Sequence, residues 1–354
     1  MKHMLICLAV LLFLTFGVCA EVVGGSCGEN ASWSLDTDTG VFLVSGSGFM
    51  KGYSPSGTES DITPWRDYKP YIKSVVIENG IRNISAFAFI DCSNLSEVVI
   101  ADGVETIDKC AFSHCSALTS VVMPDSLTAI YDHAFIYCTN LSELRLGKNI
   151  QLIKYLAFYG CKALTTVNVP ESTKTFAADA FGNIDGLTLC GSNTSYAKVY
   201  AIENGIDYNV TDGSSDITVY VDGKCLDFDV KPYMKNGRTM VPFRTIFEAI
   251  SAEVEWVEET QTVNALWDEI PLSLTIGNNV MIRKNKEFIL DVPPEIVDGR
   301  TMVPVRALSE AFRCKVSWHE PTSTVIIKTE NYEYTLDEDW LKNRFAPIDA
   351  ITLQ

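Results

Sequence analysis

The sequence predicts a solenoid of short β-strands and loops with a 23-residue period, followed by a small α+β domain with an internal duplication. Two observations carry this prediction: five segments that start 23 residues apart, and a pair of related segments offset by 62 residues. The chain has 354 residues, of which 47% are hydrophobic. At roughly 150 residues per domain, this length corresponds to about two domains with buried cores.

The first twenty residues have the pattern of a signal peptide. A short polar start precedes an apolar run from Leu5 to Phe16, and the stretch ends in Ala20, a small residue of the kind that signal peptidase favours. Lipidation of Cys19 is the alternative, although Val18 rather than a small residue precedes it. No later stretch approaches about 18 continuous apolar residues. We therefore expect a secreted, extracellular or cell-surface protein without a membrane span after residue 20.

The charge balance argues against partners that are recognised through lysine and arginine. The chain carries 45 Asp and Glu against 28 Lys and Arg, a formal net charge of −17. Acids outnumber bases both before and after residue 212. Because such a chain repels phosphate backbones and anionic lipid, we expect no nucleic-acid partner.

Residues 72–186 consist of five consecutive repeats. The copies begin at Ile72, Leu95, Leu118, Leu141 and Leu164, without insertion or deletion. The fourth and sixth positions are apolar in every copy, which is typical of a short strand, and an Ala-Phe pair follows. One unit cannot bury its apolar side alone, whereas stacked units form a continuous core. We expect the Ala to allow a tight turn and the Phe to fill the interior.

The third and fifth positions of each repeat strand are predicted to face away from the core. Valine recurs at the fifth position of three copies, which makes an apolar strip, although β-propensity alone also explains the valines. We expect this strand face to bind an extracellular protein or glycan through Val76, Glu97, Val99, Ser120, Val122, Glu143, Arg145 and Asn168. Further aromatic surface comes from Tyr131, Tyr137, Tyr155 and Tyr159, for which packing is the alternative role.

Four cysteines occupy position 21 of the repeat: Cys92, Cys115, Cys138 and Cys161. Equivalent side chains of coils stacked at about 4.8 Å point alike, whereas a tetrahedral zinc ion needs ligands that converge. We therefore interpret these cysteines as buried apolar side chains and expect no metal. An odd number of cysteines follows residue 20, so at least one thiol is unpaired or bonds to another chain, which suggests a reducing exterior.

The consensus of the copies, L-x-x-V-x-[IML]-x-x-x-[VLI]-x-x-I-x-x-x-A-F-x-x-C, closely resembles the BspA-like (Treponema pallidum type) leucine-rich repeat of secreted and surface proteins. This resemblance implies a leucine-rich-repeat solenoid as the fold class. Residues 21–71 resemble the N-terminal β cap that often precedes such repeats. Residues 187–212 resemble a C-terminal cap and linker, with a short closing helix over Ser195–Ala201. Caps are needed because an open solenoid end exposes unpaired strands.

A second domain is predicted over residues 213–328, after a linker rich in Gly, Ser and Asp. Gly237–Arg244 has the sequence GRTMVPFR and Gly299–Arg306 the sequence GRTMVPVR, 62 residues apart. Proline suits the first turn of a helix. The residues that follow it have the spacing of one buried helix face: Phe243, Ile246, Phe247 and Ile250. The next apolar residues alternate like the strands of a hairpin: Val254, Trp256, Val263 and Ala265.

The duplicated segments resemble the copper amine oxidase N-terminal-like domain of secreted bacterial proteins. The resemblance covers about Ile217 to Lys328 and implies a supporting or wall-associating stalk, since the oxidase chemistry belongs to a separate domain of those enzymes. That separate domain holds copper through three histidines. After residue 20 this chain has only His114, His133 and His319, so we expect no copper and no other cofactor.

Two arginines of this domain have an acidic residue one helical turn later. Arg244 precedes Glu248 and Arg306 precedes Glu310, at a spacing of i, i+4. Ion pairs that fix each helix are the first interpretation. Contacts of Arg244 and Arg306 with an anion, such as an acidic wall polymer, are the second.

The sequence lacks the motifs of the common hydrolases and phosphate-binding enzymes, such as Gly-x-Ser-x-Gly and His-Glu-x-x-His. We expect a non-catalytic recognition protein that acts in adhesion or in host or cell interaction, and not an enzyme. The alternatives are a secreted cell-envelope hydrolase that uses paired carboxylates and a purely structural envelope protein. The tail over residues 329–354 has no predicted role.

Overall fold

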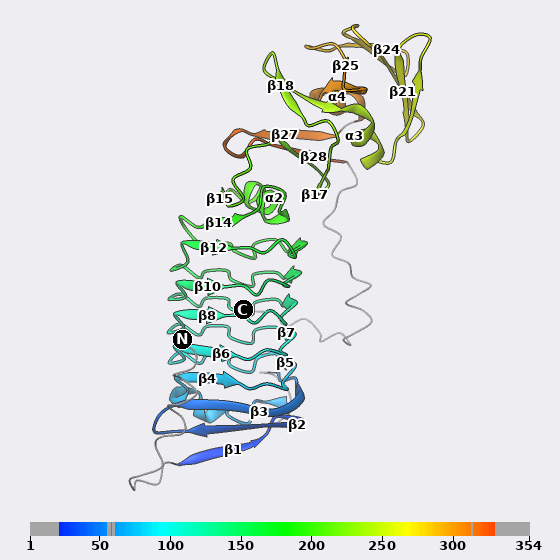
Figure 1. The fold of residues 1–354 in the computed structure, drawn as a ribbon. Helices are drawn as coiled ribbons and strands as arrows, with labels where there is room; N and C mark the ends of the chain where they lie inside the picture. The colour runs from blue at the N-terminus through cyan, green and yellow to red at the C-terminus, as the bar shows by residue number, and fades with distance from the viewer. Residues whose placement is uncertain (1–20, 55–57, 59–60, 313, 330–354) are drawn as a thin grey trace. The chain divides into compact units, whose positions relative to one another are not determined.

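The structure is a computed structural model that describes residues 21–54, 58, 61–312 and 314–329 (Figure 1). The predicted signal peptide and residues 330–354 of the predicted tail lie outside the described residues. The chain divides into two compact units. The first consists of Met1–Ile150, Lys154–Leu164 and Asp179–Ile184, and the second of Gln151–Ile153, Thr165–Ala178 and Asp185–Gln354.

The first unit begins with an antiparallel meander. It consists of β1 (Val22–Ser26), β2 (Gly28–Asp36) and β3 (Val41–Met50). A 3-10 helix, η2 (Arg66–Tyr71), follows, and β3 pairs in parallel with β4 (Ser74–Ile77). The buried Trp65 donates its indole N–H to the carbonyl of Ala88 at 2.7 Å. The meander is therefore joined to the first repeat through both the sheet and the core.

Parallel strands of successive coils form two sheets in this unit. The longer strands are β4, β6 (Glu97–Ile100), β8 (Ser120–Val122) and β10 (Glu143–Arg145), and the shorter are β5 (Asn83–Ile84), β7 (Thr106–Ile107) and β9 (Ala129–Ile130). From β4 to β10 and from β5 to β9, each strand pairs with its equivalent in the next coil, 23 residues later. The predicted 23-residue solenoid is confirmed, and inward and outward residues alternate along the longer strands as predicted.

A ladder of phenylalanine rings fills the coils. Its members are buried and come from the Ala-Phe pairs: Phe89, Phe112, Phe135, Phe158 and Phe181. Successive ring centroids are 5.0–5.4 Å apart with interplanar angles of 4–13°. This spacing follows from the strand spacing of about 4.8 Å, because equivalent residues lie directly above one another.

The repeat cysteines are fully buried free thiols, as predicted for small core side chains, but they also form hydrogen bonds. The Sγ atoms of Cys115, Cys138 and Cys161 donate to the carbonyls of Phe89, Phe112 and Phe135 at 3.1–3.2 Å. Burial raises the pKa of the Cys92 thiol to about 12. The repeat thiols therefore connect neighbouring coils, and burial keeps the Cys92 thiol in its protonated, unreactive form.

Each coil turns through two residues with a left-handed backbone, at positions 16 and 20. Position 16 has φ of 54–60° at Phe87, Cys110, His133, Leu156 and Asp179. Position 20 has φ of 56–72° at Asp91, His114, Tyr137, Gly160 and Asn183. Positive φ is uncommon outside glycine. The tight turn predicted at the Ala is thus made by the residues that flank the Ala-Phe pair.

The second unit opens with further coils and a helix. Strand β11 (Leu152–Ile153) pairs in parallel with β13 (Thr175–Phe176), and β14 (Thr188–Gly191) lies between β12 (Thr166–Asn168) and β15 (Asp207–Val210). The hydroxyl of Ser195 accepts a hydrogen bond from the N–H of Ala197 and so caps α2 (Tyr196–Glu203). The predicted closing helix is present and extends two residues further than expected.

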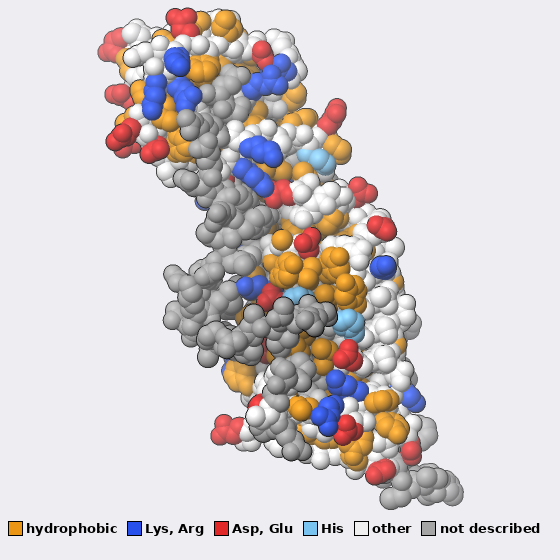
Figure 2. All heavy atoms as spheres, turned by 180° about the vertical axis from the view of Figure 1, so that it is seen from behind, with side chains coloured by type: hydrophobic (Ala, Val, Ile, Leu, Met, Phe, Trp, Pro, Cys, Tyr) orange, Lys and Arg blue, Asp and Glu red, His pale blue; other side chains and the backbone are white. Residues whose placement is uncertain are grey.

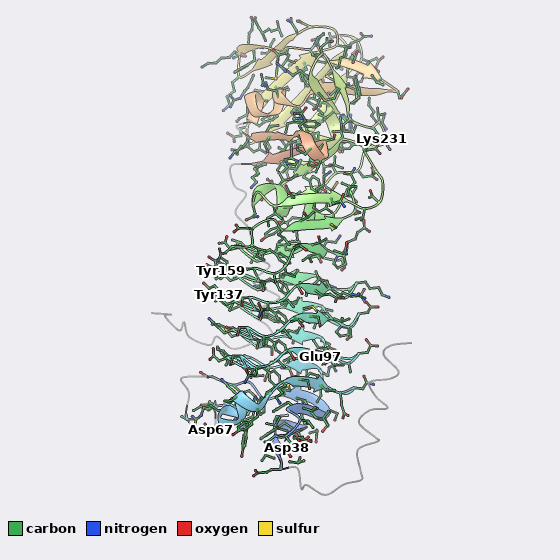
Figure 3. The ribbon with its side chains drawn as sticks, turned by 90° about the vertical axis from the view of Figure 1, so that its left-hand side faces the viewer. Asp38, Asp67, Glu97, Tyr137, Tyr159 and Lys231 are labelled. Atoms are coloured by element: carbon green, nitrogen blue, oxygen red, sulfur yellow. The ribbon has the colours of Figure 1, made fainter. Side chains whose placement is uncertain are left out.

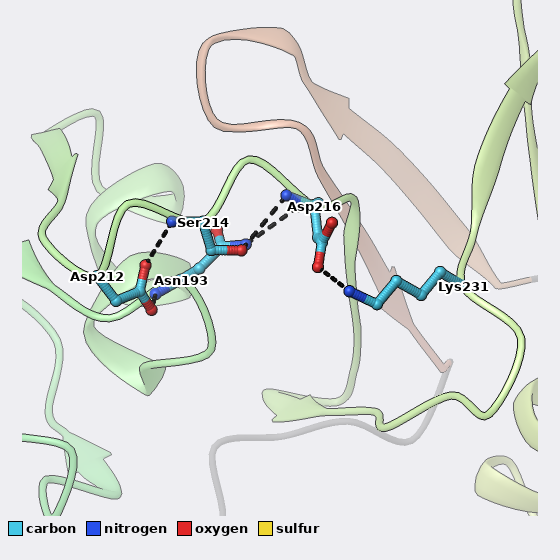
Figure 4. Close-up of polar contacts among 5 residues, drawn as sticks. All are labelled: Asn193, Asp212, Ser214, Asp216 and Lys231. Carbon is cyan, nitrogen blue, oxygen red and sulfur yellow. Dashed lines mark hydrogen bonds and ion pairs between the residues drawn. The ribbon is translucent and has the colours of Figure 1, made fainter.

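A hydrogen-bond network centred on Asn193 connects these coils to the next strand (Figure 4). The backbone N–H of Asn193 donates to Asp212 at 2.8 Å, and its side-chain amide donates to Ser214 at 3.1 Å. The fully buried Lys198 donates to the Asn193 amide oxygen at 2.6 Å and to the Thr218 hydroxyl at 2.9 Å. Asn193, which precedes the segment predicted as a linker, therefore binds Asp212 and Ser214 of that segment. Lys198 connects Asn193 to Thr218, on the strand that follows the segment.

The domain after residue 216 is mostly strands, with two seven-residue helices. A first sheet has the order β17–β16–β28–β27, made by β16 (Thr218–Val221), β17 (Lys224–Cys225), β27 (Lys315–His319) and β28 (Thr324–Lys328), with η3 (Glu320–Thr322) before β28. A second sheet has the order β18–β19–β26–β25, made by β18 (Tyr233–Lys235), β19 (Arg238–Pro242), β25 (Glu295–Val297) and β26 (Arg300–Pro304).

The third sheet is a meander of β20 (Glu253–Val257), β21 (Thr262–Trp267), β22 (Ile270–Thr275), β23 (Val280–Arg283) and β24 (Lys286–Ile289). The helices are α3 (Phe243–Ala249) and α4 (Arg306–Phe312). The four apolar residues predicted to form one face of the first helix are all buried in the domain core. The predicted hairpin is present as well, with Val254 opposite Ala265 and Trp256 opposite Val263.

Candidate functional site

The strand face of the first unit has the outward columns that the sequence predicts. Parallel pairing places Val76 beside Val99, Val99 beside Val122, and Val122 beside Arg145. Val99 and Val122 are 40% and 46% exposed, whereas Val76 is less exposed and counts as half-buried. The face is therefore a narrow apolar column on an otherwise polar sheet.

Charged residues flank the valine column. Glu97 and Glu143 are exposed on either side of the half-buried Ser120. Glu143 forms an ion pair with Arg145 at 2.8 Å. Asn168 is exposed on β12, which belongs to the second unit. The structure thus places seven of the eight predicted residues in one unit on β4 to β10. Their role in binding stays a prediction.

A second surface of the first unit carries exposed and half-buried aromatic rings. We call it the aromatic face and define it as His114, His133, Tyr137, Tyr155 and Tyr159. Figure 3 shows Tyr137 and Tyr159 on a different side of the coils from Glu97. Seen from behind, hydrophobic side chains gather beside histidines on the coils (Figure 2).

Neighbouring rings of the aromatic face contact one another. The ring centroid of Tyr137 lies 5.2 Å from that of His114 and 5.7 Å from that of Tyr159. The ring centroids of His133 and Tyr155 are 5.6 Å apart. Tyr137 and Tyr155 are 38% and 45% exposed. Burial lowers the pKa of His133, which favours its neutral ring. The face is therefore predominantly aromatic.

Two glycines hold the tyrosine rings in place. A Cβ atom at Gly160 would lie 2.7 Å from the Tyr137 ring, and one at Gly182 would lie 2.9 Å from the Tyr159 ring. Each glycine stands 23 residues after its tyrosine and so occupies the same position of the next coil. The rings therefore lie against bare backbone. Side-chain order of this kind lowers the entropic cost of binding.

The sequence predicts aromatic surface here but misses the two histidines and the supporting glycines. Both histidines lie at the left-handed positions, where side chains vary from coil to coil and show no consensus. The signal that could have found the site is a tyrosine followed by a glycine one period later. Tyr131, the fourth predicted tyrosine, is half-buried.

The two predicted anion contacts lie in ion pairs. Arg244 is 3.9 Å from Glu248, as the helical spacing predicts. Arg306 has Asp291 at 3.7 Å, and the side chain of Glu310, its expected partner, lies outside the described residues. In both pairs the arginine side chain is more than half exposed. Ion pairs exposed to this degree contribute little to stability.

The described residues contain no group of three or more His, Cys, Asp or Glu side chains that could hold a metal ion. Within the same part of the chain, no helix is long and apolar enough to cross a membrane.

Comparison with protein families identifies both regions. Residues 67–188 match the BspA type leucine rich repeat region in six copies, and residues 220–327 match the copper amine oxidase N-terminal domain. The chain therefore contains BspA-type leucine-rich repeats and a copper amine oxidase N-terminal domain. A search of curated protein sequences found no match.

Several solved structures are similar to this chain. The Treponema pallidum leucine-rich repeat protein is 22% identical, with a TM-score of 0.34 over 47% of this chain and 71% of that one. A leucine-rich cell surface protein of Faecalibacterium prausnitzii is 22% identical, with a TM-score of 0.31 over 48% and 54%. The pneumococcal vaccine antigen PcpA is 16% identical, with a TM-score of 0.32 over 62% and 57%.

Proposed function

We propose that this chain is a secreted or cell-surface, non-catalytic recognition protein. Its repeats present the binding surface to an extracellular protein or glycan, and its second domain acts as a supporting or wall-associating module. The observation that carries this proposal is the aromatic face, where the exposed Tyr137 ring and the half-buried Tyr159 ring lie against glycines of the next coil. Aromatic side chains that are ordered before binding are typical of recognition surfaces.

Two surfaces of the first unit are candidates for the contact. The strand face offers Val99 and Val122 between acidic residues, and the aromatic face offers Tyr137 and Tyr155. Larger apolar groups give the aromatic face the greater expected share of binding energy. The strand face has the regular columns of a repeat surface, which suits a partner that is itself extended.

Binding to arrayed glycans and extracellular proteins tests the proposal. We expect retention of a ligand without chemical change. The variant Tyr137→Ala/Tyr155→Ala removes the two exposed tyrosines of the aromatic face, and Val76→Asp/Val99→Asp/Val122→Asp removes the apolar column of the strand face. Loss of binding in one folded variant assigns the surface, whereas turnover of a cell-wall glycan would favour the alternative, a hydrolase with paired carboxylates.

The internal duplication of the second domain is part of the same proposal. Equivalent residues of the two segments make equivalent contacts: Arg238 with Asp291, and Arg300 with Asp229. Both acids and both arginines are 62 positions apart. This reciprocity supports a stalk built from two copies of one segment.

A further inference from the structure

Two grooves of the second domain are built from equivalent residues. The Trp256 groove has a volume of about 750 Å³ and is lined by Arg244, Trp256, Ile296 and Arg300, among others. The Trp318 groove has a volume of about 340 Å³ and is lined by Arg306, Trp318, Met234 and Arg238, among others. Every residue named for one groove has its counterpart in the other at a distance of 62 positions in the sequence.

Each groove takes residues from both segments of the duplicated pair. The tryptophan and the helix arginine come from one segment, and the strand arginine and the exposed apolar residue come from the other. The antiparallel pairing of β19 with β26 explains this exchange. It sets Val241 opposite Val303 and Met240 opposite Pro304, so the start of each strand lies toward the end of its partner.

The side chains of the grooves combine apolar surface with paired polar groups. Trp318 is 42% exposed, and Met234 and Ile296 are 50% and 48% exposed. Arg238 donates to Asp291 at 2.5 Å, and Arg300 donates to Asp229 at 2.7 Å. An arginine beside a carboxylate offers donors and acceptors side by side, whereas an indole offers a flat apolar face.

This combination matches a sugar ring better than an anion. The hydroxyl groups of a pyranose both donate and accept hydrogen bonds, and its C–H face is apolar. An acidic polymer is disfavoured in the Trp256 groove, because Asp227, Asp229, Glu248 and Glu258 outnumber its two arginines. In the Trp318 groove, both lining arginines are paired with Asp291, which lies outside the lining. The arginines of both grooves are therefore already partly neutralised, which suits hydroxyl groups better than the anionic wall polymer that their sequence suggested.

We propose that the two grooves are a pair of equivalent binding sites for a neutral glycan. Each tryptophan stacks on a sugar ring, and the strand arginine of each groove binds its hydroxyl groups, in the Trp256 groove together with Asp229. Two weak sites on one domain raise retention on a glycan-covered surface well beyond the affinity of either site. The proposal does not depend on the repeats, whose variants leave both grooves intact.

Titration of the full chain with chitohexaose, cellohexaose and laminarihexaose tests the sites, with a polygalacturonate hexamer as the acidic comparison. The readouts are calorimetry and retention on the matching insoluble glycan. We expect at least one neutral hexaose to bind. Trp256→Ala and Trp318→Ala should each weaken retention at least 10-fold, and the double variant should abolish it.

Matched variants separate binding from folding. Met234→Ser and Ile296→Ser change exposed groove residues without touching the core, and should weaken binding of the same glycan. Ile289→Ser makes the same kind of change at an apolar side chain that is 75% exposed on β24 and lines neither groove. It should leave binding unchanged. The proposal is overturned if none of the neutral hexaoses binds, if the acidic hexamer binds more tightly, or if the double variant binds like the parent chain.

Discussion

The repeat coils and the second domain use internal repetition in different ways. In the coils, each residue lies beside its own equivalent 23 positions away, as Phe112 lies on Phe135 at 5.1 Å. In the second domain, the two segments interleave, and Arg238 of one segment contacts Asp291, the other segment's equivalent of Asp229. Stacked copies therefore produce columns of like residues. Interleaved copies instead produce two equivalent sites, each of which takes residues from both copies.

The largest effect should come from breaking the phenylalanine ladder. Phe135→Ala removes a buried ring that stacks on both Phe112 and Phe158. We expect the free energy of unfolding to fall by about 3–5 kcal/mol in urea titrations followed by circular dichroism. The control Tyr137→Ala, two residues away on the aromatic face, should cost far less. Equal losses would show that the ladder does not dominate the coils.

Burial of Lys198 should make stability depend on pH. Desolvation lowers its pKa to about 8 from the ordinary 10.5. Between these values the unfolded chain binds the proton and the folded chain does not, so stability rises as pH increases from 8 to 10.5. Below pH 8, Lys198 is charged in both the folded and the unfolded chain, so its contribution to the free energy of unfolding no longer changes with pH.

The variant Lys198→Met isolates this effect. Relative to the variant, the parent chain should gain roughly 2–3 kcal/mol between pH 8 and pH 10.5, because each pKa unit corresponds to about 1.4 kcal/mol. Chemical denaturation at several pH values measures the difference. A constant difference would mean that Lys198 titrates normally and that the buried network of Asn193 and Thr218 fully compensates its charge.

A smaller effect is expected from the thiol ladder. Cys138→Ala removes a buried Sγ atom and its hydrogen bond to the carbonyl of Phe112, which keeps the N–H of Cys115 as a donor at 3.3 Å. We expect a loss of about 1–2 kcal/mol, and a smaller loss for Cys138→Ser, which keeps a donor. In the folded protein at pH 8, iodoacetamide should leave Cys138 unmodified. Rapid modification would contradict the buried position.

The smallest effect should come from the reciprocal ion pairs of the second domain. Arg238→Met and Arg300→Met break exposed pairs, so each should lower the melting temperature by no more than about 4 °C in calorimetry. The two variants should behave alike if the segments are equivalent. A large loss from one of them alone would show that the grooves are not equivalent.

The sequence predicts much of the coils because their periodicity is local. Inward residues such as Val98 and Phe112 recur every 23 positions, and their burial follows from stacking alone. The left-handed turns at His114 and His133 could not be predicted, since their side chains have no pattern and only the backbone repeats. The support of Tyr137 by Gly160 depends on a contact between coils that a single copy does not reveal.

The second domain shows the limit of pattern reasoning more clearly. The apolar spacing from Phe243 to Ile250 predicts a buried helix face, because that signal lies within eight residues. The domain is nevertheless mostly strands, since the segment Arg238–Pro242, for which no strand was predicted, pairs with its equivalent far along the chain. The grooves follow from that long-range pairing, so neither segment alone indicates them.

The most direct test of the account is the binding of the parent chain and its surface variants to one array of glycans and extracellular proteins. The account predicts a retained, chemically unchanged ligand. It also predicts that Tyr137→Ala/Tyr155→Ala or Val76→Asp/Val99→Asp/Val122→Asp loses a ligand at unchanged melting temperature. A ligand set that is the same for the parent chain and for both folded variants would contradict recognition by the repeats.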